Sequence, residues 1–161
     1  MSAQQTAHHM SELGRLCNRD PVSIEPTADI VAAAGLMREK HIGFVVVAEM
    51  QPARGGKRVV GVLTDRDIVV AVVAREVDPR DLRVSDVMTA NPLIVSEECS
   101  IDAALGFMRD AGVRRVPVVG PDGNLCGVLS LDDVLERLAA QLSSVAGCIR
   151  SEQKAERIVR P

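Results

Sequence analysis

Two stretches of the chain carry apolar residues at the spacing of an amphipathic helix. In each, apolar side chains fall at positions i, i+3, i+4 and i+7, which lie on one helical face. The first set is Ile30, Ala33, Ala34 and Met37, and the second is Ile101, Ala104, Leu105 and Met108. Asp29 and Ser100 stand just before them, where a side-chain oxygen can cap the first free amides. The pattern predicts helices beginning at about residues 30 and 101.

β-Branched runs follow both predicted helices: "FVVVA" from Phe44 and "RVPVV" from Arg115. Such runs favour strands, and each leads through a Gly-containing turn to a second run, "VVGVL" or "LCGVL". Short extended runs, "VSI" and "LIV", precede the helices, and short helical turns are expected at residues 13–17 and 84–88. A final helix should begin after Thr64 and after Ser130. The order β-α-β-β-α occurs twice, which predicts an α+β fold with the helices on one face of each small sheet.

The two halves of the chain are also similar in sequence. A shift of 71 residues places 13–47 on 84–118, and nine of the aligned pairs are identical. After a shorter loop in the second half, the shift falls to 66 and "GVLTDRDIV" from Gly61 aligns with "GVLSLDDVL" from Gly127. A length change in a Gly-rich surface turn is well tolerated. The chain is therefore interpreted as a duplicated domain.

The repeat defines the predicted domain organisation. We expect a disordered tail over residues 1–10, a first repeat over 11–76, a linker over 77–82, a second repeat over 83–142 and a C-terminal helical tail over 143–161. One copy of about 60 residues would be only marginally stable alone. The two copies are therefore expected to share a core, packed sheet against sheet.

The amino-acid composition argues against nucleic-acid binding and against insertion into a membrane. The chain has two Phe, no Trp and no Tyr, so it lacks the aromatic surfaces that bind single-stranded nucleic acid. The net charge of −3 has no basic stripe, which argues against a nucleic-acid partner. No apolar run approaches the ~20 residues of a membrane helix, and no signal peptide is recognised. Four widely spaced cysteines predict reduced thiols and a cytoplasmic protein rather than a metal site.

The shared ending G-h-h-[S/T]-x-x-D, in this tandem β-α-β-β-α context, resembles a pair of CBS domains, often called a Bateman module. The resemblance covers roughly residues 11–142. It implies two repeats related by pseudo-twofold symmetry, with two clefts between them that bind adenine nucleotides or adenosyl ligands. It also implies a regulatory homodimer. The family's hydroxyl residue and aspartate correspond to Thr64 and Asp67 in the first copy and to Ser130 and Asp133 in the second.

By the same resemblance, each cleft combines residues of both copies. Cleft A is expected to comprise Cys17, Val22, Ile42, Arg114, Arg115, Ser130 and Asp133. Cleft B is expected to comprise Met88, Leu93, Val113, Thr64 and Asp67, together with Gly43 and Phe44. Only cleft A has arginines where phosphate contacts are expected, and Arg binds phosphate oxygens with two parallel hydrogen bonds. We therefore expect AMP, ADP, ATP, NAD or S-adenosylmethionine as candidate ligands, with the phosphorylated ones in cleft A.

Other interpretations of these residues remain open. Thr64 and Ser130 can act simply as helix N-caps, and the aspartates can complement the helix dipole. Arg114 and Arg115 can pair with acidic residues or cross a dimer interface. The chain shows no nucleophile, base and orienting residue together, so no enzymatic activity is predicted. The leading prediction is a homodimeric ligand sensor that acts on an unknown regulated protein. The alternative is a structural interaction protein with empty clefts.

Overall fold

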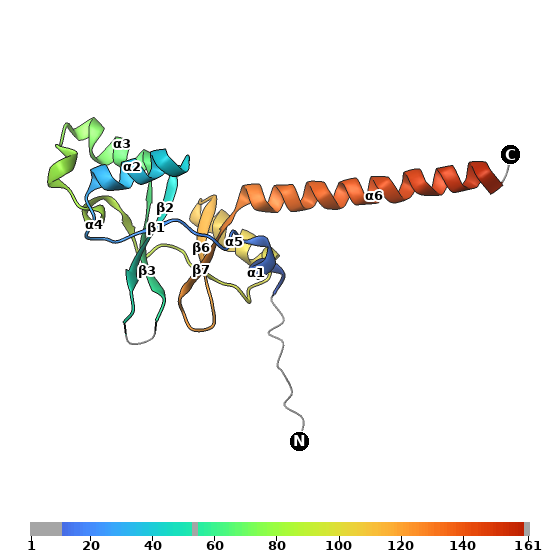
Figure 1. The fold of residues 1–161 in the computed structure, drawn as a ribbon, viewed down its shortest axis with the longest axis horizontal. Helices are drawn as coiled ribbons and strands as arrows, with labels where there is room; N and C mark the ends of the chain where they lie inside the picture. The colour runs from blue at the N-terminus through green and yellow to red at the C-terminus, as the bar shows by residue number, and fades with distance from the viewer. Residues whose placement is uncertain (1–10, 53–54, 160–161) are drawn as a thin grey trace, which may run out of the picture.

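The computed structural model describes residues 11–52 and 55–159, with side chains described as far as residue 153. The predicted tail over residues 1–10 lies outside the described residues. The rest of the chain forms two small sheets with their helices, followed by one long helix (Figure 1). None of the helices described is both long and apolar enough to cross a membrane.

Each half follows the predicted β-α-β-β-α order. The first half contains β1 (Ser23–Ile24), α2 (Ile30–Lys40), β2 (Phe44–Met50), β3 (Lys57–Thr64) and α3 (Asp65–Ala71). The second contains β5 (Val95–Ser96), α5 (Ile101–Ala111), β6 (Arg115–Val119), β7 (Leu125–Ser130) and α6 (Leu131–Val159). In both sheets the first strand pairs in parallel with the second, and the second and third form an antiparallel hairpin. The α+β fold predicted from the repeat is confirmed.

The predicted caps of α2 and α5 are confirmed. The Asp29 carboxylate accepts a hydrogen bond from the Ala32 amide at 2.6 Å, and the Ser100 hydroxyl accepts one from Ala103 at 3.2 Å. The predicted inner face of α2 needs one correction, because Ala34 is exposed. Leu36 packs against the core from the edge of that helix instead.

The short segment before each half packs against the other half. The helix α1 (Glu12–Leu16) buries Leu13 in the core of the second half. The helix α4 (Val84–Val87) buries Val84 in the core of the first half, and β4 (Thr89–Ala90) extends the first sheet beside β3. Asn18 exchanges two backbone hydrogen bonds with Val128 in β7, at 2.9 and 3.0 Å. Each half is therefore completed by the other, and the 3₁₀ turns η1 (Val73–Arg75) and η2 (Pro79–Asp81) lead from one to the next.

This exchange explains one feature of the repeat, the glycine in the middle of each last strand. A methyl group at Gly61 would overlap the Met88 sulfur, and one at Gly127 would overlap the Cys17 sulfur and the Asn18 carbonyl. Glycine allows another backbone to approach a strand this closely. The repeated "GVL" thus marks where each incoming segment crosses a strand of the other half.

The two sheets pack face to face, as predicted. Val46, Ala48 and Val59 of the first sheet are buried in one cluster with side chains of the second, namely Val119, Leu125 and Val128. This shared layer joins the two separate helix-and-sheet cores. It also leaves room between the sheets at one end, where the candidate site lies.

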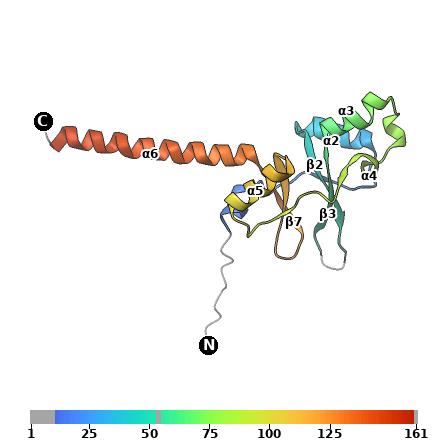
Figure 2. The same cartoon turned by 180° about the vertical axis from the view of Figure 1, so that it is seen from behind.

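Two helices carry apolar residues on their outer surface. On the "IVVAVVA" segment, Val72 is buried, but Val69, Val70 and Val73 are each more than half exposed. The helix α6 continues without a break across the predicted boundary between residues 142 and 143 and extends away from both sheets (Figures 1 and 2). The exposed valines and the extended part of α6 are therefore both candidate surfaces for contact with another copy of the protein.

Candidate functional site

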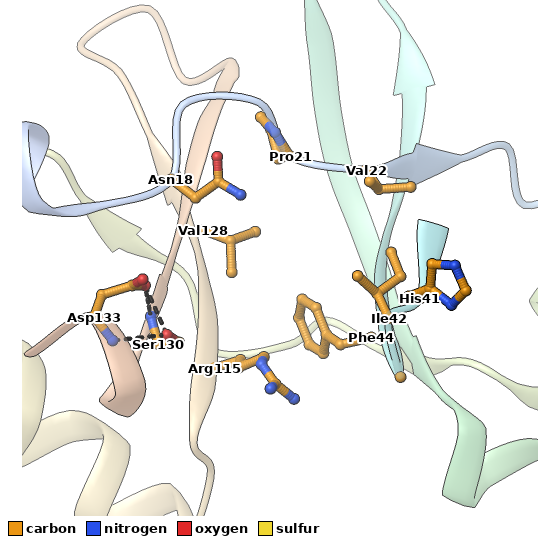
Figure 3. A pocket seen from close by; sticks show the side chains of 11 residues that line it. Asn18, Pro21, Val22, His41, Ile42, Phe44, Arg115, Val128, Ser130 and Asp133 are labelled. Carbon is orange, nitrogen blue, oxygen red and sulfur yellow. Dashed lines mark hydrogen bonds between the residues drawn. The ribbon is translucent and has the colours of Figure 1, made fainter. Parts of the chain in front are cut away.

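A pocket of about 240 Å³ lies between the two halves. Three parts of the chain form it: the segment after α1, the junction of α2 with β2, and the β6–β7–α6 region (Figure 3). It is lined by Asn18, Pro21, Val22, His41, Ile42, Gly43, Phe44, Arg115, Val128, Ser130 and Asp133. The site therefore exists only when both repeats are folded and packed together.

Ser130 and Asp133 are fixed by three short hydrogen bonds at the start of α6. Asp133 Oδ2 accepts from the Ser130 amide at 2.9 Å and from its hydroxyl at 2.6 Å, while the Asp133 amide donates to Ser130 Oγ at 3.1 Å. This capping box satisfies amides that the first helical turn would otherwise leave free. Since both the strand and the helix hold the pair, the carboxylate at the pocket wall has a fixed orientation.

The capping box engages only one of the two carboxylate oxygens. Within the described residues, every hydrogen bond to Asp133 from a neighbouring side chain or amide ends on Oδ2. Oδ1 is thus left as an acceptor at the pocket. The N-cap interpretation of Ser130 is confirmed, and the capping box leaves Oδ1 of Asp133 without a hydrogen bond among the described residues.

Arg115 supplies the positive charge of the pocket. Its guanidinium lies 3.5 Å from the Asp132 carboxylate, and both side chains are substantially exposed, at 41% and 75%. An ion pair this exposed contributes little stability, so a ligand anion can compete for the arginine at low cost. The alternative in which Arg115 pairs with an acidic residue is therefore compatible with a ligand role.

The structure brings together five of the seven residues predicted for cleft A: Val22, Ile42, Arg115, Ser130 and Asp133. The other two do not line the pocket. Arg114 is exposed, and its carbonyl accepts a hydrogen bond from the Leu131 amide. Cys17 is 5% exposed and belongs to the core of the second half. Burial raises the pKa of the Cys17 thiol, so the residue acts as a small apolar side chain.

The residues predicted for cleft B are not part of this pocket. Thr64 and Asp67 form the same capping box as Ser130 and Asp133, with Asp67 Oδ2 accepting from the Thr64 amide at 2.8 Å and hydroxyl at 2.7 Å. Met88 and Leu93 pack against the two cores, and Val113 is 36% exposed. Gly43 and Phe44, expected in cleft B, instead line the pocket with Asp133.

Four residues that line the pocket were not predicted from the sequence: Asn18, Pro21, His41 and Val128. His41 ends α2 in the left-handed conformation, with φ of 55°, which turns the chain toward β2. Asn18 follows α1 and is held by its backbone pairing with Val128. Its side-chain oxygen accepts the Asp20 amide at 2.9 Å, which leaves the amide nitrogen as a donor. The exchange of segments between the halves places Asn18 and Pro21 here, and the sequence pattern did not show which half α1 joins.

The chemistry of the pocket suits the binding of a polar organic ligand. Apolar walls, a fixed acceptor, an arginine and an amide donor can hold a polar organic ligand in one orientation. Among the described residues, no three His, Cys, Asp or Glu side chains lie together in a way that could hold a metal ion.

Comparison with known proteins defines the class. The family model for the CBS domain matches residues 11–74 and 84–140, one match for each half of the chain. The chain belongs to the CBS-domain family and carries a tandem pair.

Similar proteins include relatives and solved structures. An uncharacterised protein of Methanopyrus kandleri is 32% identical over 77% of this chain, and the aligned region spans 61% of that longer relative. The structure of a hexameric CBS-CP12 protein from bloom-forming cyanobacteria is 25% identical, with a TM-score of 0.64 over 86% of both chains. The CBS domain pair of protein MJ0100, in complex with 5′-methylthioadenosine and S-adenosylmethionine, is 19% identical, with a TM-score of 0.67 over 80% of this chain and 96% of that one. The last of these supports the fold alone.

Proposed function

We propose that this chain is a non-catalytic regulatory module that binds an adenine nucleotide or adenosyl ligand in the pocket between its two halves. The observation that carries the proposal is the convergence of Arg115, the free Oδ1 of Asp133 and apolar side chains from both halves on one pocket. A CBS pair of the same fold is known in complex with 5′-methylthioadenosine and S-adenosylmethionine, and we take this ligand class as the one to test.

Each part of the ligand has a matching part of the pocket. Val22, Ile42 and Val128 offer apolar contact for a purine base, and the Phe44 ring faces the same space (Figure 3). Asp133 Oδ1 can accept a hydrogen bond from a ribose hydroxyl, and hydrogen bonds to a charged acceptor are stronger than neutral ones. Arg115 can bind phosphate oxygens, which favours AMP, ADP, ATP or NAD over uncharged adenosyl compounds.

A ligand in this pocket would change the relation between the two halves. Because residues from both repeats line it, binding favours whichever packing of the sheets fits the ligand best. A partner protein that contacts both repeats could sense this difference. We propose an unidentified cytoplasmic protein as that partner.

The proposed sensor is a homodimer, and its exposed valines support this. Val69, Val70 and Val73 form an apolar strip on α3 and η1, and Phe107 on α5 is 51% exposed. Exposed apolar surface of this kind often marks a protein–protein contact. The hexameric CBS-CP12 relative shows that a related pair assembles. Light scattering at micromolar concentration tests the dimer, and a monomer would contradict it.

The test of ligand binding is calorimetric titration with AMP, ADP, ATP, NAD, S-adenosylmethionine and adenosine. The proposal requires that at least one adenine compound binds and that the pocket variants described in the Discussion weaken it. If none of these compounds binds, the result favours the alternative function, a structural interaction protein with empty clefts whose exposed valines contact another protein.

A further inference from the structure

The long helix α6 presents an apolar seam along a largely exposed surface. Leu135, Leu138, Leu142, Val145 and Ile149 are each at least half exposed. Their spacing alternates between three and four residues, which keeps them on one stripe of the helix. That alternation is the pattern of a two-stranded coiled coil.

The helix is also poorly suited to stand alone in water. Residues 138–149 contain no charged side chain, so no ion pairs along the helix support them. Ser143, Ser144, Val145 and Gly147 all have lower helix propensity than alanine. Figures 1 and 2 show this part of α6 extending beyond both sheets. Because helices in proteins depend mainly on packing of an apolar face, this seam requires a partner.

We propose that the partner is α6 of a second copy, packed antiparallel as a two-stranded coiled coil. The inference goes beyond the ligand-binding function and does not depend on it. Antiparallel pairing about a twofold axis near residue 140 sets Leu135 opposite Val145 and Leu138 opposite Leu142, each pair occurring twice in the dimer. It brings Ile149 level with Leu131, which is half-buried and packs against the core of the second half at the base of the helix.

The residues beside the seam fit the same arrangement. Ala139 lies one residue from the axis, about 3 Å along the helix from its own copy, and so small a side chain permits close approach of two helices. Asp132, on the acidic first turn, lies within about 3 Å along the helix of Arg150 on the partner helix, so the antiparallel pair places no acidic first turn beside another. A parallel pair would instead set the acidic first turns, with Asp132, Asp133 and Glu136, beside each other.

One seam residue, Leu138, also lines a groove between the base of α6 and the helices α1 and α5. The apolar residues that line this groove are Leu16, Ile101, Val134 and Leu138, and the polar or charged ones are Glu12, Ser100, Asp102, Arg137 and Gln141. In the antiparallel arrangement the partner helix runs back toward this base, because Ile149 lies level with Leu131. The far end of the partner's α6 would therefore approach the groove, where Leu138 belongs to both surfaces.

The first test compares two double variants of the full chain by light scattering. Leu142→Asp with Val145→Asp places charges in the seam, while Ser143→Asp with Ser144→Asp places the same charges on exposed positions outside it. We expect the seam variant to show half the mass of the parent and the control to keep the parental mass. Equal masses for all three proteins would overturn the proposal. A cooperative melting transition and a nucleotide titration check that the two repeats of each variant remain folded.

The second test fixes the orientation by cross-linking. Cys148 is the exposed cysteine of the described residues, and Cys148→Ser removes it. In that background Ala139→Cys should form a disulfide-linked dimer under mild oxidation, because the two copies lie close to the axis. Ile149→Cys should not, since at 1.5 Å per residue it lies about 27 Å along the helix from its copy. A cross-link at 149 with none at 139 would contradict the antiparallel pairing, and a cross-link at neither would overturn the seam itself.

Discussion

At the residue scale, the two hydroxyl–aspartate pairs have the same local structure but different surroundings. In both, the carboxylate accepts two hydrogen bonds on one oxygen and holds the start of a helix. Only Asp133 lies in a pocket with an arginine. The motif alone therefore fixes the orientation of the aspartate carboxylate. Whether that carboxylate can accept a hydrogen bond from a ligand depends on the residues around it.

Arg115 should control the preference for phosphorylated ligands. Replacing it with Gln removes the charge from the pocket, so affinity for ATP should approach that for adenosine. In the parent, added salt should weaken ATP binding because exposed charges are screened. Arg114→Gln is the matched control, since Arg114 is exposed and does not line the pocket. Calorimetry at two salt concentrations measures both effects, and equal binding of ATP and adenosine by the parent would remove the phosphate role.

Gly127 should be sensitive to the smallest substitution. In Gly127→Ala the added methyl group would meet Cys17 Sγ at 2.7 Å and the Asn18 carbonyl at 2.8 Å, so the incoming segment must shift. Overpacking of this kind costs about 1–3 kcal/mol. Gly106→Ala is the control, because nothing lies within 4 Å of an added methyl group there. It should stabilise the helix by about 0.5–1 kcal/mol. Urea unfolding compares the two, and similar effects would contradict the proposed close approach.

Cys126 should resist alkylation while the protein is folded. Burial, with a further contribution from nearby Glu97, raises the pKa of its thiol to about 11. The thiolate is the reactive form, and at pH 8 almost none is present in the folded state. Mass spectrometry of iodoacetamide-treated protein should show slow labelling of Cys126 until urea is added. Equally fast labelling with and without urea would contradict this environment.

At the element scale, the principal finding is that each leading segment completes the other half. Periodicity predicted α2 and α5 with their caps, and β-branched runs predicted the hairpins, because these signals are local. The destinations of α1 and α4 were not predictable. They depend on which core accepts Leu13 and Val84, and a short apolar turn fits either core. Cys17 was placed in a cleft and lies in a core for the same reason.

Because α1 packs against the second half, a destabilising substitution in α1 should loosen the second half and not the first. Leu13 is fully buried in that core, and a Leu→Ala change in a core costs about 2–5 kcal/mol. In Leu13→Ala, amide hydrogen exchange should therefore accelerate in β6 and β7 more than in β2. Val84→Ala is the mirror control and should affect β2 and β3. Faster exchange only in the half that contains each substitution would contradict the exchange of segments.

At the scale of the whole molecule, the sequence predicted the duplication and the sheet-against-sheet packing, because both are properties of repeated patterns. It also predicted five residues of the pocket, through the family resemblance. It did not separate the two clefts correctly, since Gly43 and Phe44 line the pocket with Asp133. These two residues directly follow His41 and Ile42, so the short connection from α2 to β2 places all four at the same pocket.

The central claim is that the pocket between the halves binds an adenine compound through Asp133. In Asp133→Asn, the amide oxygen can replace Oδ2 in the capping box, so stability should fall only by about 0.3–1 kcal/mol from the lost charge near the helix start. The amide nitrogen then faces the pocket where Oδ1 was an acceptor. Hydrogen bonds to charged groups contribute roughly 1.5–3 kcal/mol, which is a loss of about one to two decades in affinity.

The most direct test is therefore calorimetric titration of ATP into the parent, Asp133→Asn and Asp67→Asn, with a melting curve for each. Asp67→Asn makes the same change to an identical capping box outside the pocket. We expect Asp133→Asn to weaken ATP binding by about one to two decades and Asp67→Asn to bind ATP nearly as the parent does. Parental affinity in Asp133→Asn, or a larger loss in Asp67→Asn, would contradict the central claim.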